Sequence, residues 1–116
     1  MTENTRANLA AKRYLQLSGR QIIEDDWHGF IVVQDNGGIA FCDVFVTYDG
    51  MSIKFKGCKR EVYEEAAYDF LQIHDDVVDV PLRYDMIELF VCGDGGRALV
   101  RHIVDASLED DEHECV

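Results

Sequence analysis

The chain has 116 residues, the size of one domain, and its 11 Lys and Arg face 23 Asp and Glu, which gives a formal net charge of −12. This balance makes nucleic-acid binding doubtful, because contacts to phosphates need a surplus of Lys and Arg on at least one face. No run of about 18 uncharged apolar residues is present, which excludes a membrane-spanning helix.

The first half of the chain predicts one helix followed by three strands. Residues 5–18 are rich in helix formers, and one face of this helix is expected to carry Ala7, Ala10, Ala11, Tyr14 and Leu17. Strands are predicted over 20–27, 30–33 and 39–48. The last two are joined by a turn at Asp-Asn-Gly-Gly, since Asn and Gly tolerate a positive φ. The nearly continuous apolar run of 39–48 indicates burial on both faces.

The second half predicts one helix and two further strands. Residues 59–73 place an apolar stripe at helical spacing, and strands follow over 82–91 and 98–104, with a short extension expected at 51–55. A strand, a helix and a second strand in this order favour a parallel pair joined by a crossover. We therefore expect a single α/β domain in which a mixed sheet is flanked by helices.

The cysteines and the N-terminus bear on location. Residues 1–13 contain no apolar segment of the signal-peptide type. The cysteines lie far apart with no spacing of the zinc-binding kind: Cys42, Cys58, Cys92 and Cys115. We expect a cytoplasmic protein with reduced thiols, with one domain over 1–107 and an acidic tail over 108–116.

Five short strings stand out along the predicted elements: NLAAKRYL at 8–15, GFIVV at 29–33, FCDVF at 41–45, RYDMI at 83–87 and HIVDA at 102–106. Together with the order of elements and the second helix over 59–71, they resemble the YraN family of small predicted endonucleases. The family's first-helix pattern is E-x-x-A-x-x-Y-L, its strand strings are G-E-I-D-L, F-V-E-V-K and R-F-D-V-V, and its closing string is H-I-x-D-A. The resemblance covers roughly residues 6–107.

This resemblance implies a restriction-endonuclease-like fold related to Holliday-junction resolvases. In such a nuclease, several carboxylates hold Mg²⁺, and the metal and a Lys stabilise the charge that develops on the scissile phosphate. At the family's five metal and Lys positions this chain has Asn8, Phe30, Val32, Asp43 and Phe45, so Asp43 is the one acid that remains. A lone aspartate holds Mg²⁺ poorly, because Mg²⁺ dehydrates reluctantly. We expect a degenerate site and no cofactor.

Three functions follow from these patterns. The favoured hypothesis is a YraN-like protein that has lost its metal site and acts as a non-catalytic binding or assembly protein. The first alternative is a divergent Mg²⁺-dependent endonuclease with relocated ligands, for example Asp25, Asp26, Asp43 and Asp85. The second alternative is an acidic module that binds a basic protein partner. The sequence does not name the partner or the oligomeric state.

Other candidate residues each have an ordinary explanation beside the functional one. Asp43 is either a residual metal ligand or a strand carboxylate that lies at a solvated edge or pairs with Lys54 or Lys56. A basic cluster would contact phosphates or an acidic partner, or would only balance nearby glutamates; its members are Lys54, Lys56, Lys59 and Arg60. His28 is either a general base or an exposed histidine, and His102 is more often a packing or hydrogen-bonding residue. The Asp-Gly-Gly at 94–96 is typical of a hairpin turn, and His113 supports no specific role.

Overall fold

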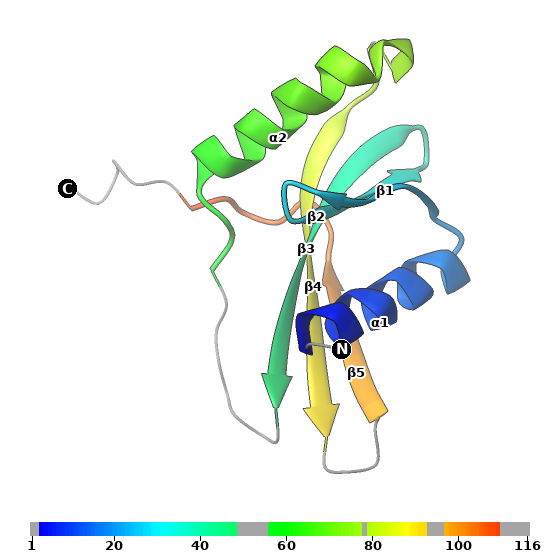
Figure 1. Ribbon diagram of the computed structural model, residues 1–116, viewed down its shortest axis with the longest axis vertical. Coiled ribbons are helices and arrows are strands. Elements are labelled where there is room, and N and C mark those ends of the chain that lie inside the picture. Colours follow the sequence, from blue (N-terminus) through cyan, green and yellow to red (C-terminus); the bar gives the residue numbers. More distant parts are fainter. Residues whose placement is uncertain (1–2, 49–55, 78, 93–96, 110–116) are drawn as a thin grey trace, which may run out of the picture.

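The computed structural model describes residues 3–48, 56–77, 79–92 and 97–109. Figure 1 shows two helices and a sheet, in an order that follows the sequence-based prediction closely. The extension expected at 51–55 lies outside the described residues. The elements are α1 (Glu3–Leu17), β1 (Gln21–Trp27), β2 (Phe30–Asp35), β3 (Gly38–Tyr48), α2 (Arg60–Ile73), a 3-10 turn (Asp75–Val77), β4 (Leu82–Cys92) and β5 (Arg97–Ile103).

The five strands form one mixed sheet in the order β1-β2-β3-β4-β5. β3 and β4 are parallel, with Phe41 opposite Tyr84, and every other neighbouring pair is antiparallel. The parallel pair requires a crossover, which α2 supplies, because two parallel strands cannot be joined by a tight turn. The expected single α/β domain with a mixed sheet and flanking helices is confirmed. None of the described helices is long and apolar enough to cross a membrane.

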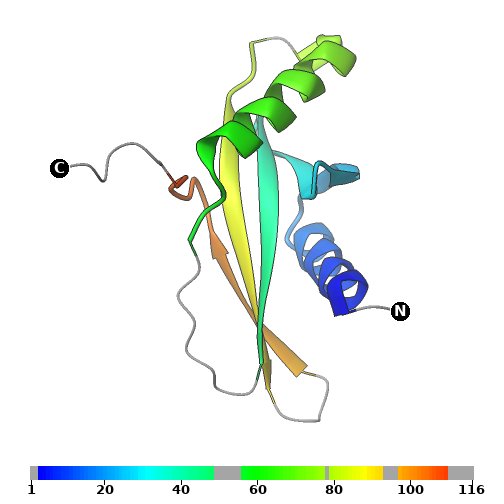
Figure 2. The same ribbon diagram turned by 60° about the vertical axis from the view of Figure 1, so that its left-hand side comes forward.

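The sheet is covered on opposite faces by the two helices (Figure 2). Side chains alternate along a strand, so neighbours such as Phe41 and Cys42 face different layers, and both are fully buried. The α1 layer of the core contains Ala7, Ala11, Leu15, Ile31, Val33, Ala40, Cys42, Ile87 and Leu89. The α2 layer contains Phe30, Val32, Ile39, Phe41, Ala66, Ala67, Phe70, Tyr84 and Met86.

The buried face of α1 agrees with the predicted one in part. Ala7 and Ala11 face the sheet and Tyr14 packs beside them, as expected, whereas Leu17 is 79% exposed and Ala10 is also exposed. The prediction was wrong for Ala10 and Leu17 because alanines occur on two sides of this helix, so that helical spacing alone does not fix the centre of the buried face. Leu15 is larger than the alanines, and its burial against the sheet decides which face of α1 is buried. Leu17 then lies at the end of the outer face.

The β2–β3 hairpin closes at the turn that the sequence predicts. Asp35 pairs with Gly38, and the two residues between them, Asn36 and Gly37, have φ values of 53° and 81°. Two consecutive positive φ values are the mark of a tight type I′ turn, whose twist matches that of the strands. This turn fixes the register of β2 against β3, and with it the face on which each later side chain lies.

Candidate functional site

Four of the five positions that the sequence resemblance assigned to a nuclease metal site lie on one face of the sheet. Phe30 and Val32 of β2 and Asp43 and Phe45 of β3 all face the α2 layer, since Val32 pairs with Phe41 and side chains alternate from there. Asn8 lies on α1, on the opposite face. The structure therefore brings together the strand positions and leaves the helix position in the other layer.

The two β2 positions are part of the hydrophobic core. Phe30 is 3% exposed and Val32 is fully buried. The ring of Phe30 meets Phe41 and Tyr84 edge to face, with centroids 6.0 and 6.1 Å apart. Phe45 packs against the same cluster. Apolar side chains in this arrangement offer no oxygen ligand to a hard cation and stabilise the sheet by burial instead.

Asp43 is bound by a tyrosine from the neighbouring strand. The Tyr84 hydroxyl donates a 2.6 Å hydrogen bond to Oδ2 of Asp43 and accepts one of 2.9 Å from the backbone N–H of Cys58. Burial raises the pKa of Asp43, and the hydrogen bond from Tyr84 opposes that effect. Its hydrogen-bond partner is therefore Tyr84, while Lys54, one of the partners suggested from sequence, lies outside the described residues.

The four aspartates of the relocated-ligand alternative do not converge. Asp25 is exposed on β1, where Lys12 Nζ lies 3.5 Å from its Oδ2, and Asp26 is also exposed. Asp85 pairs with Cys42, so it faces the α1 layer, whereas Asp43 faces the α2 layer. Among the described residues, the groups close enough to share a metal ion are Cys42 with Asp85 and His102, and His28 with Glu65 and Asp69.

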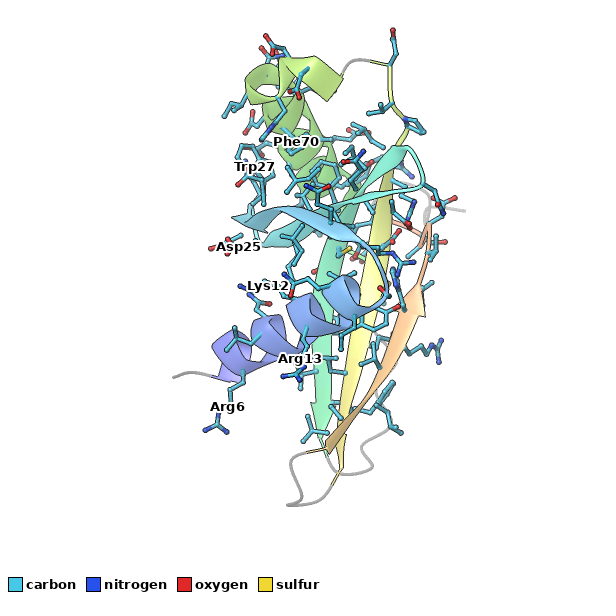
Figure 3. The ribbon with its side chains drawn as sticks, turned by 90° about the vertical axis from the view of Figure 1, so that its right-hand side faces the viewer. Arg6, Lys12, Arg13, Asp25, Trp27 and Phe70 are labelled. Carbon is cyan, nitrogen blue, oxygen red and sulfur yellow. The ribbon has the colours of Figure 1, made fainter. Side chains whose placement is uncertain are left out.

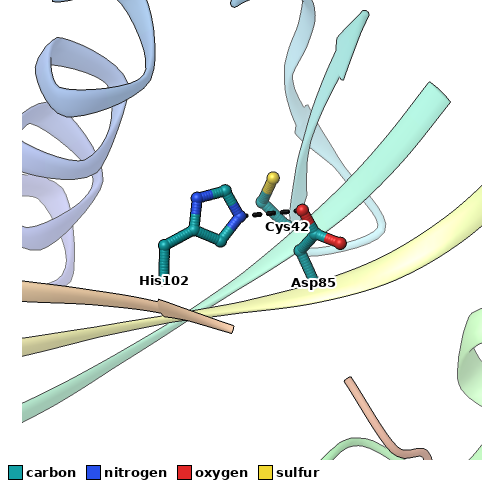
Figure 4. Close-up of side chains that lie close together, drawn as sticks. All are labelled: Cys42, Asp85 and His102. Carbon is teal, nitrogen blue, oxygen red and sulfur yellow. Dashed lines mark hydrogen bonds and ion pairs between the residues drawn. The ribbon is translucent and has the colours of Figure 1, made fainter. Parts of the chain in front are cut away.

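A buried polar network on the α1 face was not predicted from the sequence. His102 Nε2 donates to Oδ2 of Asp85 at 2.8 Å (Figure 4), and its Nδ1 lies 2.8 Å from the Tyr14 hydroxyl of α1. The side chain of Asp85 is fully buried and that of His102 is 6% exposed. With Nε2 protonated, Nδ1 of a neutral imidazole accepts from Tyr14. His102 is thus a hydrogen-bonding residue that connects α1 to β4 and β5.

Asp85 is the centre of this network. Its Oδ1 accepts from Arg83 Nε at 2.9 Å and from the backbone N–H of Asp105 at 2.9 Å, and Arg83 also reaches Oδ2 at 3.1 Å. Burial would raise the pKa of Asp85, but the bonds from His102 and Arg83 outweigh it and lower that pKa to about 2. The carboxylate is therefore charged and has donors on both oxygens.

The network continues to the β2–β3 hairpin through Arg83. Its second nitrogen donates to Asp35 at 2.8 Å, and Arg20, just before β1, donates to the same oxygen at 3.1 Å. The hydrogen bond from Arg83 is the main cause that lowers the pKa of Asp35. The chain of ion pairs fixes the entry to β1, the hairpin turn and β4 relative to one another.

The buried group of Cys42, Asp85 and His102 has the ligand types of a transition-metal site but not the free electron pairs. Both oxygens of Asp85 already accept hydrogen bonds, and Arg83 places a positive charge beside them. Burial, with a smaller effect of Asp85, raises the pKa of the Cys42 thiol to about 12, so the sulfur is protonated. We interpret the group as a structural hydrogen-bonded cluster.

The second group joins the β1–β2 turn to α2 at the surface. His28 Nε2 lies 3.1 Å from Oδ2 of Asp69, and both side chains are more than a third exposed. Nearby, His74 Nε2 lies 2.9 Å from Glu24, and its ring stacks on Phe70 at 4.2 Å. These histidines act as surface links between β1 and α2, and exposed acidic groups of this kind are common without a metal ion.

The predicted basic cluster surrounds the start of α2. Lys56, Lys59 and Arg60 are exposed, and Lys54 lies outside the described residues. The backbone there is paired with the C-terminal segment, because Arg60 N–H donates to Glu109 O at 3.1 Å and Glu109 N–H donates to Cys58 O at 2.8 Å. The Asp-Gly-Gly at 94–96 and His113 also fall outside the described residues.

No protein-family model matches the chain, and no curated protein matches it.

Proposed function

We propose that the protein is a non-catalytic binding or assembly protein with a restriction-endonuclease-like fold, whose nuclease metal site has been replaced by hydrophobic core. The order of helix, three strands, helix and two strands supports the fold part of the proposal. One observation carries the functional part: Phe30 and Val32, at positions where the YraN family has carboxylates, are buried among aromatic and aliphatic side chains.

The remaining acid adds to this argument. Asp43 is held by Tyr84 at 2.6 Å, and it belongs to neither of the groups of three or more possible metal ligands found among the described residues. Mg²⁺ needs several oxygen ligands in a near-octahedral arrangement. The alternative of a Mg²⁺-dependent nuclease with relocated ligands is therefore less well supported, since Asp25, Asp26 and Asp85 point to other regions of the molecule.

A nuclease assay tests the proposal directly. We expect the wild-type protein to leave linear duplex, branched and single-stranded DNA and RNA intact in the presence of Mg²⁺ or Mn²⁺. The reason is that hydrolysis needs a metal held by carboxylates next to the attacked phosphate. The assay compares wild type with Asp43→Ala, each with and without EDTA.

The comparison of these four samples shows whether cleavage depends on a metal ion and on Asp43. Cleavage that EDTA abolishes but Asp43→Ala retains does not use the one acid left at the family's positions, so the loss of that metal site stands. Cleavage by wild type that is lost both with EDTA and in Asp43→Ala contradicts the proposal and supports the relocated-ligand alternative.

A further inference from the structure

The turn between β1 and β2 places a histidine against two acids of α2. The two residues of this turn, His28 and Gly29, have φ values of 53° and 87°. Two consecutive positive φ values are typical of a tight hairpin turn, which leaves the backbone of His28 little freedom. Its Nε2 lies 3.1 Å from Oδ2 of Asp69, and the ligand atoms of His28, Glu65 and Asp69 all lie within 4.8 Å of one another. The turn therefore brings an imidazole nitrogen to two carboxylates.

Trp27, the last residue of β1, holds this turn against α2. Its indole N–H donates to the carbonyl oxygen of Ala66 at 2.9 Å, and its ring meets Phe70 edge to face with centroids 5.8 Å apart (Figure 3). Ala66 comes directly after Glu65 and is fully buried. Phe70 comes directly after Asp69 and is also fully buried. The three side chains therefore extend from two elements that are already packed together, so that little further ordering is needed for them to hold an ion.

The two acids of this group lie one helical turn apart on α2, where two negative charges repel each other. Asp69 has the imidazole of His28 as its partner, whereas Glu65 forms no hydrogen bond or ion pair with any group in the described part of the chain. A cation between the three side chains would relieve the repulsion and use the free carboxylate. Acids alone would not support a site, and the fixed imidazole is what completes the ligand set.

The types of ligand determine the kind of ion. An imidazole nitrogen with carboxylate oxygens suits a divalent transition metal such as Zn²⁺, whereas Mg²⁺ and Ca²⁺ prefer oxygen ligands alone. Bonds of about 2.1 Å in a tetrahedral Zn²⁺ site place two ligand atoms about 3.4 Å apart, and the 3.1 Å between His28 Nε2 and Asp69 Oδ2 is close to this separation. Glu65 is exposed, so its side chain can turn to close the remaining distance.

We propose that His28, Glu65 and Asp69 form a Zn²⁺-binding site that links the β1–β2 turn to α2. The protein supplies three ligands, and water takes the fourth position of the tetrahedral ion. The inference goes beyond the proposed function, because the site uses none of the positions assigned to the nuclease. Three ligands at the surface predict a dissociation constant of about 1–100 µM for Zn²⁺. Binding of Mn²⁺ should be much weaker, since Mn²⁺ stands at the low end of the affinity order of these metals.

Titration calorimetry of Zn²⁺ with the full chain tests the site. His28→Gln, Glu65→Gln and Asp69→Asn each remove one ligand at nearly constant size, and we expect each to weaken Zn²⁺ binding by about tenfold or more. Glu64→Gln, which changes the neighbouring exposed acid of α2, is the matched control for the acids. His74→Gln, which changes the neighbouring histidine beside Trp27, is the control for the imidazole. Both controls are expected to bind Zn²⁺ as wild type does.

Trp27 provides a second readout, because it is the one tryptophan of the chain and its ring lies 5.5 Å from that of His28 between centroids. Ni²⁺ bound to His28 should quench its fluorescence, and His28→Gln should remove this effect while His74→Gln retains it. Zn²⁺ should also raise the unfolding temperature of wild type but not of the three ligand variants. Without metal, these variants should unfold close to wild type, since the side chains that they change lie at the surface.

Two results would overturn the inference. One is a wild-type protein that shows no saturable Zn²⁺ binding up to about 1 mM. The other is binding that the three ligand variants retain, or that Glu64→Gln or His74→Gln weakens by as much. Neither result bears on the proposed function, which the nuclease assay with Asp43→Ala tests separately.

Discussion

Replacing Asp85 by Ala is expected to lower the free energy of unfolding by about 3–5 kcal/mol. The side chain is fully buried, and its removal leaves Arg83, His102 and the backbone N–H of Asp105 without their acceptor. Urea denaturation followed by circular dichroism measures the effect. Asp26→Ala, which changes an exposed aspartate, is the control and is expected to stay within about 0.5 kcal/mol of wild type. A loss below about 1 kcal/mol for Asp85→Ala would show that the network does not support the fold.

The same carboxylate predicts a pH dependence of stability. The pKa of Asp85 is lowered to about 2 in the folded protein from an ordinary value of 3.8. A carboxyl group with a lowered folded pKa stabilises the protein fully above its unfolded pKa, and this contribution is lost as the pH falls from about 4 through about 2. Over that range the difference in stability between wild type and Asp85→Ala should therefore shrink.

Replacing Phe70 by Ala is expected to cost about 3–5 kcal/mol of unfolding free energy. Phe70 is fully buried under α2, its ring lies 5.5 Å from Phe41 and 5.8 Å from Trp27 between centroids, and His74 stacks on it. The cost combines the lost burial of the ring with the cavity that remains. Denaturant unfolding measures it.

The neighbouring residue on the same helix provides the control. Leu71 is 38% exposed, so Leu71→Ala removes a smaller apolar group from a position open to solvent and leaves little cavity. We expect it to cost clearly less than Phe70→Ala, by about 2 kcal/mol or more. Equal losses for the two variants would show that the α2 layer of the core is packed differently from the arrangement described above.

Much of the fold could be predicted from local patterns. The Asp-Asn-Gly-Gly turn indicated the β2–β3 hairpin, and the continuous apolar run of β3 indicated burial on both faces, because such patterns depend on residues close in sequence. The face of α1 was predicted correctly for Ala7, Ala11 and Tyr14 but wrongly for Ala10 and Leu17, because the alanines are alike and the packing of Leu15 against the sheet decides the centre of the buried face.

The candidate site was only partly predictable for a related reason. Phe30, Val32 and Phe45 are incompatible with metal binding by their chemistry alone, so their apolar character was evident in the sequence. The network around Asp85 joins residues as far apart as Tyr14 and His102, and no local spacing relates them. An acid and an arginine inside an otherwise apolar strand, as in Arg83 and Asp85, are the signal that could have indicated it, because buried charges are nearly always paired.

A titration of Mn²⁺ into the wild-type protein and into Asp43→Asn, followed by electron paramagnetic resonance of the free ion, tests the central claim that the nuclease metal site is lost. Because Phe30, Val32 and Phe45 offer no ligand and Tyr84 holds Asp43, we predict two superimposable curves that show only weak, non-saturating binding to surface acids. A saturable single site in wild type that disappears in Asp43→Asn would contradict the claim.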